Sequence, residues 1–80
     1  MQELKKIPHV SGLKQTERAV KREKAKRVFI ARDANPIMLE KLRVLCVERN
    51  VPLEEGHTMR ELGNACGLDV GAAAAALIGE

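Results

Sequence analysis

The sequence predicts an α/β protein: a three-layer α/β/α sandwich with a central four-stranded mixed β-sheet. Strand-like and helix-like segments alternate along the chain, and no linker or internal repeat divides its 80 residues, which predicts one domain over residues 1–80. Hydrophobic residues make up 45% of the chain, but Phe29 is its only aromatic residue. The core must therefore be aliphatic and rich in alanine, with thin layers that approach closely.

The first third of the chain predicts a short extended stretch, a helix and a strand. Residues 7–10 are extended around Pro8, and the helix runs from residue 11 or 12 to about Glu23. Spacing of three and four residues places its inward side chains on one face: Leu13, Thr16, Ala19 and Val20. The run Lys26–Ala31 reads as a strand, and its lack of alternation indicates that both faces are covered.

The middle of the chain predicts a longer helix. Asn35 is suited to the N-cap and Pro36 to the first helical position, so the helix runs to about Arg49 and Asn50 closes it. Asp33, at the end of the preceding strand, is expected to cap this helix. The side chains expected to point inward are Met38, Leu42, Leu45 and Cys46.

A strand and a short helix are expected next. Residues 51–54 form the strand, which Pro52 should keep at a sheet edge or at a strand start. Thr58 and Glu61 have the spacing of a capping box, so a helix should begin at residue 59 and end at Gly67.

The last segment, Ala72–Ile78, is ambiguous by local criteria. Its five alanines favour a helix by propensity, whereas the alternation of the preceding elements favours a closing strand. We predict a strand, because small side chains let helices on both faces sit close to it.

Charge is distributed unevenly. Residues 1–32 contain ten Lys/Arg and three Asp/Glu, a net +7, whereas residues 33–80 contain four and eight, a net −4. Such asymmetry is typical of a face that binds a polyanion. A basic helix that only keeps the protein soluble is the alternative.

Other classes of site have little support in the sequence. Cys46 and Cys66 lack CxxC spacing, and His9 and His57 lie far apart, so we expect neither a disulfide, nor a metal site, nor a cofactor. No segment is long and apolar enough for a membrane span, and the first six residues do not resemble a signal peptide, so a cytoplasmic protein is expected.

The segment Gly12–Arg18 brings hydrogen-bond donors and positive charge to a helix start. Helix N-termini present unpaired N–H groups, and Gly12 lets a phosphate or another backbone come close. Lys14, Gln15 and Arg18 can read base edges, because Lys and Arg bind guanine O6 and N7 while Gln both donates and accepts. An ordinary basic first helix is the alternative.

The segment Leu68–Val70 places two apolar side chains around one acid, Asp69, in a predicted loop bracketed by Gly67 and Gly71. Unpaired RNA bases rest on apolar or aromatic surfaces, which Leu68 and Val70 could supply. The alternative is that both side chains point into the core and that Gly67 only ends a helix.

These segments resemble the kink-turn RNA-binding ribosomal protein family: the archaeal L-seven-Ae and eukaryotic L-thirty-e proteins and short bacterial relatives of the YbxF type. The resemblance covers residues 7–78 and rests on three motifs: Gly12–Arg18 (Gly-Leu-Lys-Gln-Thr-Glu-Arg), Ala31–Pro36 (Ala-Arg-Asp-Ala-Asn-Pro) and Leu62–Ala73. It implies the same three-layer fold, including the closing alanine-rich strand.

The resemblance also implies a function and a set of contacts. Family members bind RNA that bends sharply at a short bulge beside tandem sheared G·A pairs. Lys14, Gln15 and Arg18 would then contact the guanines of those pairs. Leu68, Asp69 and Val70 would contact the bulge, and Asn35 and Leu39 lie where the family holds a flipped-out nucleotide.

The chain departs from the family pattern at several positions. Many archaeal members have Asn-Glu where this chain has Lys14-Gln15, a pair that resembles the L-thirty-e and short bacterial branch. Glu23 replaces a frequent glycine, which should lengthen or reshape the end of the first helix. Arg32 stands where an acid is common, and Leu13 is bulkier than usual. These changes bear on the preferred RNA sequence.

Together with this resemblance, the sequence predicts a monomeric protein, not an enzyme; the resemblance implies that it stabilises a kink-turn in ribosomal RNA or a riboswitch leader. The fold also resembles substrate-binding domains of some RNA methyltransferases, but no nucleophile and base are paired in the sequence. A protein-interaction scaffold within a ribonucleoprotein, using the acidic second half, is the other alternative.

Overall fold

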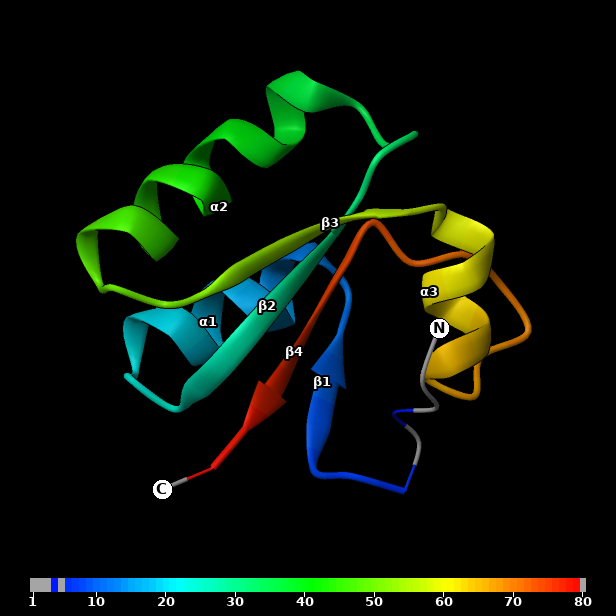
Figure 1. The fold of residues 1–80 in the computed structure, drawn as a ribbon, viewed down its shortest axis with the longest axis horizontal. Coiled ribbons are helices and arrows are strands. Elements are labelled where there is room, and N and C mark those ends of the chain that lie inside the picture. Colours follow the sequence, from blue (N-terminus) through cyan, green and yellow to red (C-terminus); the bar gives the residue numbers. More distant parts are fainter. Residues whose placement is uncertain (1–3, 5, 80) are drawn as a thin grey trace.

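The computed structural model describes residue 4 and residues 6–79 and contains four strands and three helices (Figure 1). In chain order these are β1 (His9–Ser11), α1 (Leu13–Lys21), β2 (Ala25–Ala31), α2 (Pro36–Glu48), β3 (Leu53–His57), α3 (Met59–Ala65) and β4 (Ala74–Ile78). The predicted three-layer α/β/α sandwich is confirmed. No helix in this part of the chain is long and apolar enough to cross a membrane.

The four strands form one mixed sheet in the order β1-β4-β2-β3. β4 is antiparallel to both β1 and β2, whereas β3 is parallel to β2. Edge position suits β3, because Pro52, just before it, has no N–H to donate and uses its carbonyl to accept from Val28 N–H at 2.9 Å.

Helices cover both faces of the sheet, α1 and α2 on one side and α3 on the other (Figure 1). Successive residues of β2 alternate between the two faces: Val28 and Ile30 pack with α1 and α2, and Phe29 and Ala31 pack with α3. All four side chains are buried. This is the reason for the unbroken apolar run in the sequence.

The alanine-rich segment is a central strand, as predicted, and not a helix. Ala74 and Ala76 face α1 and α2, while Ala75 faces α3, and all three are fully buried. Because each side chain adds only one carbon, both helical layers lie close to this strand. Tertiary packing therefore overrides the helix propensity of alanine.

The boundaries of four elements differ from the prediction. Helix α1 ends at Lys21, because Glu23 adopts a left-handed conformation, and α3 ends two residues before Gly67. Strand pairing begins two residues later than predicted, so β3 covers Leu53–His57 instead of residues 51–54. β1 likewise extends to Ser11.

Two side chains were assigned to the wrong environment. Met38 is 57% exposed, and the buried stripe of α2 consists instead of Leu39, Leu42 and Cys46. Asp33 caps α3, not α2: its Oδ1 accepts a hydrogen bond from Met59 N–H at 2.7 Å. The prediction failed because parallel pairing of β2 and β3 brings the end of β2 beside the start of α3.

Candidate nucleic-acid interface

The three motif segments converge at one end of the sheet. Strands β1 and β2 end there and β4 begins there, because β4 runs antiparallel to both. Gly12 N–H donates to Ala74 O at 2.8 Å, and Ala31 N–H donates to Ala73 O at 2.9 Å. These two main-chain hydrogen bonds join the start of α1 and the end of β2 to the segment that leads into β4.

Side chains from the same three segments also pack against the hydrophobic core beneath this junction. Leu13, Ala34 and Ala73 are partly buried, and each packs against the core cluster beneath α1 and α2. All three segments are therefore anchored to the same core cluster. Segments that are separated by up to 60 residues in the sequence are thus joined at one end of the sheet.

Helix α1 begins with uncapped donors. Gly12 occupies the N-cap with φ 95° and ψ 151°, a region of backbone space that is essentially restricted to glycine. No described side chain caps the helix, and its first turn contains no acidic residue. The N–H groups of the first turn thus face outward together with the positive end of the helix dipole.

The predicted base-reading side chains lie on this exposed start. Lys14, Gln15 and Arg18 are all exposed. Arg18 borders two shallow hollows, one on each flank of the helix. One hollow is lined by Lys14, Glu17, Arg18 and Lys21, and the other by Val10, Gln15, Arg18, Ala19, Arg22, Lys24 and Ile78.

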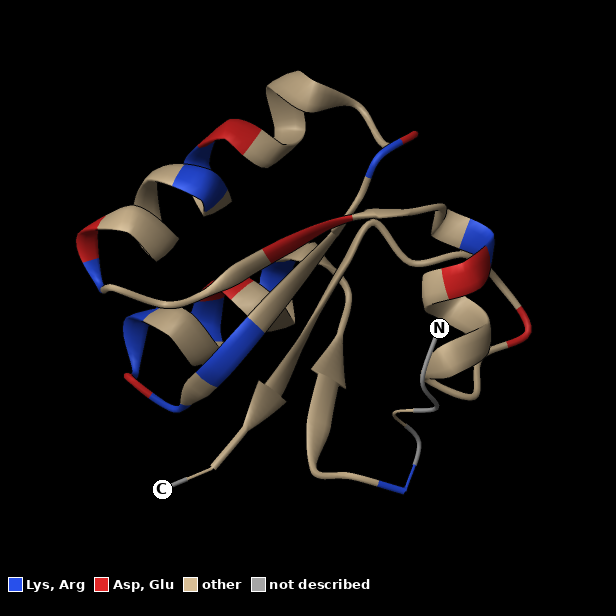
Figure 2. Cartoon of the chain, in the orientation of Figure 1, with Lys and Arg blue, Asp and Glu red and all other residues tan. Residues whose placement is uncertain are grey.

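The basic residues of α1 form no ion pair with the other residues that the structure describes. Among the described residues, the ion pairs are Arg27–Glu54, Arg43–Glu55 and His57–Glu54, all of them on other elements. The blue segments of α1 in Figure 2 therefore mark charge that remains available to a partner. Arg32, exposed at the end of β2, adds a further positive charge beside the junction.

The 68–70 loop (Leu68, Asp69 and Val70) lies on the surface. Leu68 is 36% and Val70 71% exposed, so the alternative in which both side chains point into the core is wrong. Gly67 follows the C-cap residue of α3 in the left-handed conformation, with φ 79°. The loop therefore combines both features: a helix terminus and an outward apolar pair.

Asn35 and Leu39 have different surroundings. Asn35 is exposed, and its Oδ1 accepts from Ile37 N–H at 2.9 Å, which caps α2 as predicted. Leu39 is only 1% exposed and belongs to the core, so its side chain offers no surface to a nucleotide in this conformation. The apolar surface beside Asn35 comes instead from Ile37, which is 83% exposed and which sequence reasoning missed.

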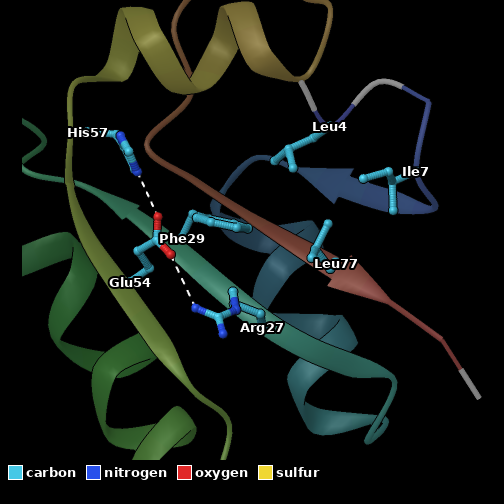
Figure 3. Close-up of a pocket in the computed structure, with 7 residues that line it drawn as sticks. All are labelled: Leu4, Ile7, Arg27, Phe29, Glu54, His57 and Leu77. Atoms are coloured by element: carbon cyan, nitrogen blue, oxygen red, sulfur yellow. Dashed lines mark hydrogen bonds and ion pairs between the residues drawn. The ribbon is translucent and has the colours of Figure 1, made fainter. Parts of the chain in front are cut away.

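A separate hollow of about 390 Å³ lies on the α3 side of the sheet (Figure 3). Its polar wall is internally paired: the Glu54 carboxylate accepts from Arg27 at 3.2 Å and from Nε2 of His57 at 2.7 Å. The remaining lining is apolar: Leu4, Ile7, Phe29 and Leu77. None of these lining residues belongs to the three motif segments.

Metal-binding and thiol chemistry find no geometric support in this part of the chain. The described residues contain no group of three or more His, Cys, Asp or Glu that could hold a metal ion. Cys46 and Cys66 are buried and unpaired, and burial raises the pKa of both thiols, which keeps them protonated at neutral pH.

Comparison with known proteins finds a ribosomal protein family and relatives that are named RNA-binding proteins. A family model described as "Ribosomal protein L7Ae/L30e/S12e/Gadd45 family" matches residues 2–80. The chain is 44% identical over 69 residues to the RNA-binding protein YbxF of Geobacillus stearothermophilus, covering 86% of this chain and 84% of that protein. It is 46% identical over 72 residues to an RNA-binding protein of Caldanaerobacter subterraneus, covering 89% and 88%.

The fold is also similar to that of a solved structure. The Giardia lamblia 15.5kD RNA binding protein superposes with a TM-score of 0.84 at 30% sequence identity. The match covers 91% of this chain but 62% of the longer Giardia chain, so the present chain spans less than two thirds of that protein.

Proposed function

The chain belongs to the ribosomal protein L7Ae/L30e/S12e/Gadd45 family, and on that premise we propose that it is an RNA-binding protein that recognises and stabilises kink-turns. The observation that carries the proposal is that the uncapped basic start of α1 is hydrogen-bonded, at one end of the sheet, to the segment that leads from the exposed apolar 68–70 loop into β4. We further propose that it acts as a cytoplasmic monomer without catalytic activity, on ribosomal RNA or a riboswitch leader.

Helix α1 would bind the tandem G·A pairs. Lys14 and Arg18 donate to guanine O6 and N7, and Gln15 can pair with a base edge as both donor and acceptor. The uncapped N–H groups beside Gly12 suit a phosphate oxygen. One helix start would thereby combine base reading with backbone anchoring.

The 68–70 loop would receive the bulge. Val70 and Leu68 offer an apolar surface on which an unpaired base can rest, and this contact depends little on base identity. Asn35 would hold a flipped-out nucleotide through its side-chain amide N–H groups, because its oxygen is already used to cap α2. Leu39 is not part of the proposed site.

A gel-shift titration with a fluorescent kink-turn RNA tests the proposal. The control RNA has Watson–Crick pairs in place of the tandem G·A pairs. We expect tight binding to the kink-turn and loss of binding to the control. Equal weak binding to both RNAs would reduce the protein to a basic domain with non-specific RNA affinity.

Substitution of Lys14 locates the site. Lys14→Ala should weaken kink-turn binding by about 1–3 kcal/mol, because it removes a contact to guanine. Lys41→Ala is the matched control: Lys41 is also exposed, but it lies on α2 outside the motif segments. Binding should also fall steeply with salt concentration. Equal losses in both variants would contradict the assignment.

A second candidate function, a protein scaffold within a ribonucleoprotein, is favoured by one observation. Helix α2 exposes four apolar side chains, whereas most surface helices keep such residues inward. They are Ile37, Met38, Val44 and Val47. Co-purification of a protein partner after nuclease treatment, together with only non-specific RNA binding, would favour this function over kink-turn recognition.

A further inference from the structure

The 68–70 loop is fastened to helix α3 at both ends. Leu68 N–H donates to Gly63 O at 2.9 Å, and Ala72 N–H donates to Met59 O at 3.0 Å. The two acceptors lie one helical turn apart, so the loop runs back along the surface of α3. Its position is therefore determined by how closely its backbone can approach that helix.

Gly63 sets that approach. It is buried in the interior of α3, and a Cβ atom built on it would overlap the carbonyl oxygen of Val70. The same Cβ would lie 3.0 Å from the carbonyl carbon of Val70 and 3.0 Å from Cα of Gly71. These are backbone atoms, so no change of rotamer relieves the overlap. The loop would need to retreat by about 1 Å to regain ordinary contact distances.

Glycine at this position has no other local advantage. Its φ lies outside the left-handed region, so any residue could adopt the backbone conformation. Within a helix, glycine costs about 1 kcal/mol relative to alanine. The close contact between helix and loop is thus what requires glycine here.

We propose that Gly63 is a positioning residue for RNA binding, which sets where Leu68 and Val70 meet the unpaired base. This inference rests on the proposed kink-turn function. The backbone that Gly63 contacts belongs to Val70 itself, the more exposed of the two apolar residues, so a shift at the contact moves that side chain directly. The start of α1 would not follow, because Gly12 is held by Ala74 in the sheet.

The test compares two variants on two RNAs. One RNA is a kink-turn, and the other is a duplex with the same tandem G·A pairs but no bulge. Gly63→Ala should bind the kink-turn about tenfold more weakly, the scale of a lost base contact, and should bind the bulge-free duplex like the parent. Asn64→Ala, at the adjacent exposed position of α3, should match the parent on both RNAs.

A purely structural role would have a different signature. Damage to the whole fold would weaken binding to both RNAs equally, and that result would overturn the inference, as would unchanged binding of Gly63→Ala to the kink-turn. If the parent binds both RNAs equally, the proposed function fails and the inference fails with it. If the parent prefers the kink-turn and Gly63→Ala binds the kink-turn as tightly as the parent does, only the inference is refuted.

Gly71→Ala decides the question if Gly63→Ala does not fold, as monitored by far-UV circular dichroism. A Cβ on Gly71 would lie 3.2 Å from Cβ and 3.3 Å from the carbonyl oxygen of Met59, so the loop would move by only a few tenths of an ångström. We expect a loss of about two- to threefold on the kink-turn alone, within the range for partial loss of stacking. No loss would overturn the inference.

Discussion

All three helices end in the same backbone motif, but each has a different residue in its left-handed position. These residues are Glu23 at φ 58°, Asn50 at φ 56° and Gly67 at φ 79°. After α1, Lys24 N–H donates to Ala19 O at 2.9 Å and Glu23 N–H to Val20 O at 3.0 Å. This Schellman pattern recurs after α2 and α3. The chain therefore contains an internal comparison of glutamate, asparagine and glycine in one geometry.

Glu23→Gly should stabilise the protein. The left-handed conformation costs a residue with a Cβ about 1–2 kcal/mol, whereas the greater freedom of glycine in the unfolded chain costs about 0.4–1 kcal/mol. The Glu23 side chain is exposed and makes no hydrogen bond or ion pair with the other described residues, so its removal loses nothing. The free energy of unfolding should rise by about 0.5–1 kcal/mol, which raises Tm by about 2–8 °C.

Variants at the other two helix ends serve as comparisons for the stability change expected of Glu23→Gly. Asn50→Gly should change stability by less than about 0.5 kcal/mol, because asparagine tolerates this conformation. Gly67→Ala should lower it by about 1 kcal/mol. Glu23→Gln removes the negative charge from the helix C-terminus but keeps the strain, so it should contribute only about 0.3 kcal/mol.

Urea denaturation followed by far-UV circular dichroism measures these changes, since the chain has no Trp or Tyr for fluorescence. The reasoning is refuted if Glu23→Gly is no more stable than the parent. It is also refuted if Glu23→Gln gives the same gain, because the effect would then be electrostatic and not conformational.

Two further predictions concern a buried hydroxyl and pH. The hydroxyl of Thr16 is fully buried without a hydrogen-bond partner among the described residues, so Thr16→Val should raise the free energy of unfolding by about 1 kcal/mol; a loss would reveal a partner such as an internal water. The Arg43 guanidinium donates two hydrogen bonds of 2.6 Å to Glu55 and lowers the pKa of that carboxyl. The pair therefore stabilises the folded state above the pKa of an unfolded glutamate, about 4.3, and this stabilisation is lost as the pH falls through the lower pKa of folded Glu55. Because both side chains are partly exposed, the effect should stay below about 1 kcal/mol. Glu55→Gln should reduce the fall in stability between about pH 5 and pH 3, and identical falls in parent and variant would contradict this.

Local signals in the sequence predicted the elements well. Asn35 and Thr58 begin helices through side chains that act within three residues, and the structure has both caps. Asp33 shows the limit of such reasoning: its partner, Met59, is 26 residues away and becomes a neighbour only when β2 and β3 pair in parallel. No local pattern contains that pairing.

Helix α2 shows a second limit. Apolar residues lie all around it, so the pattern fits more than one inward stripe, and the one chosen included Met38 instead of Leu39. The same error affected the site, because Leu39 was assigned to the surface by resemblance alone. A periodic pattern identifies a buried face only where the opposite face is polar.

The candidate site is built mainly from the backbone. Main-chain hydrogen bonds from Gly12 to Ala74 and from Ala31 to Ala73 hold its segments together, and the contact between Gly63 and Val70 places the loop. The exposed side chains thus contribute contacts without maintaining the geometry. Substitutions at Lys14, Gln15 or Arg18 should therefore change affinity while the site keeps its shape, whereas a single carbon added at Gly63 should change the shape while every contacting side chain remains. Comparing the two kinds of variant on one RNA separates recognition from positioning.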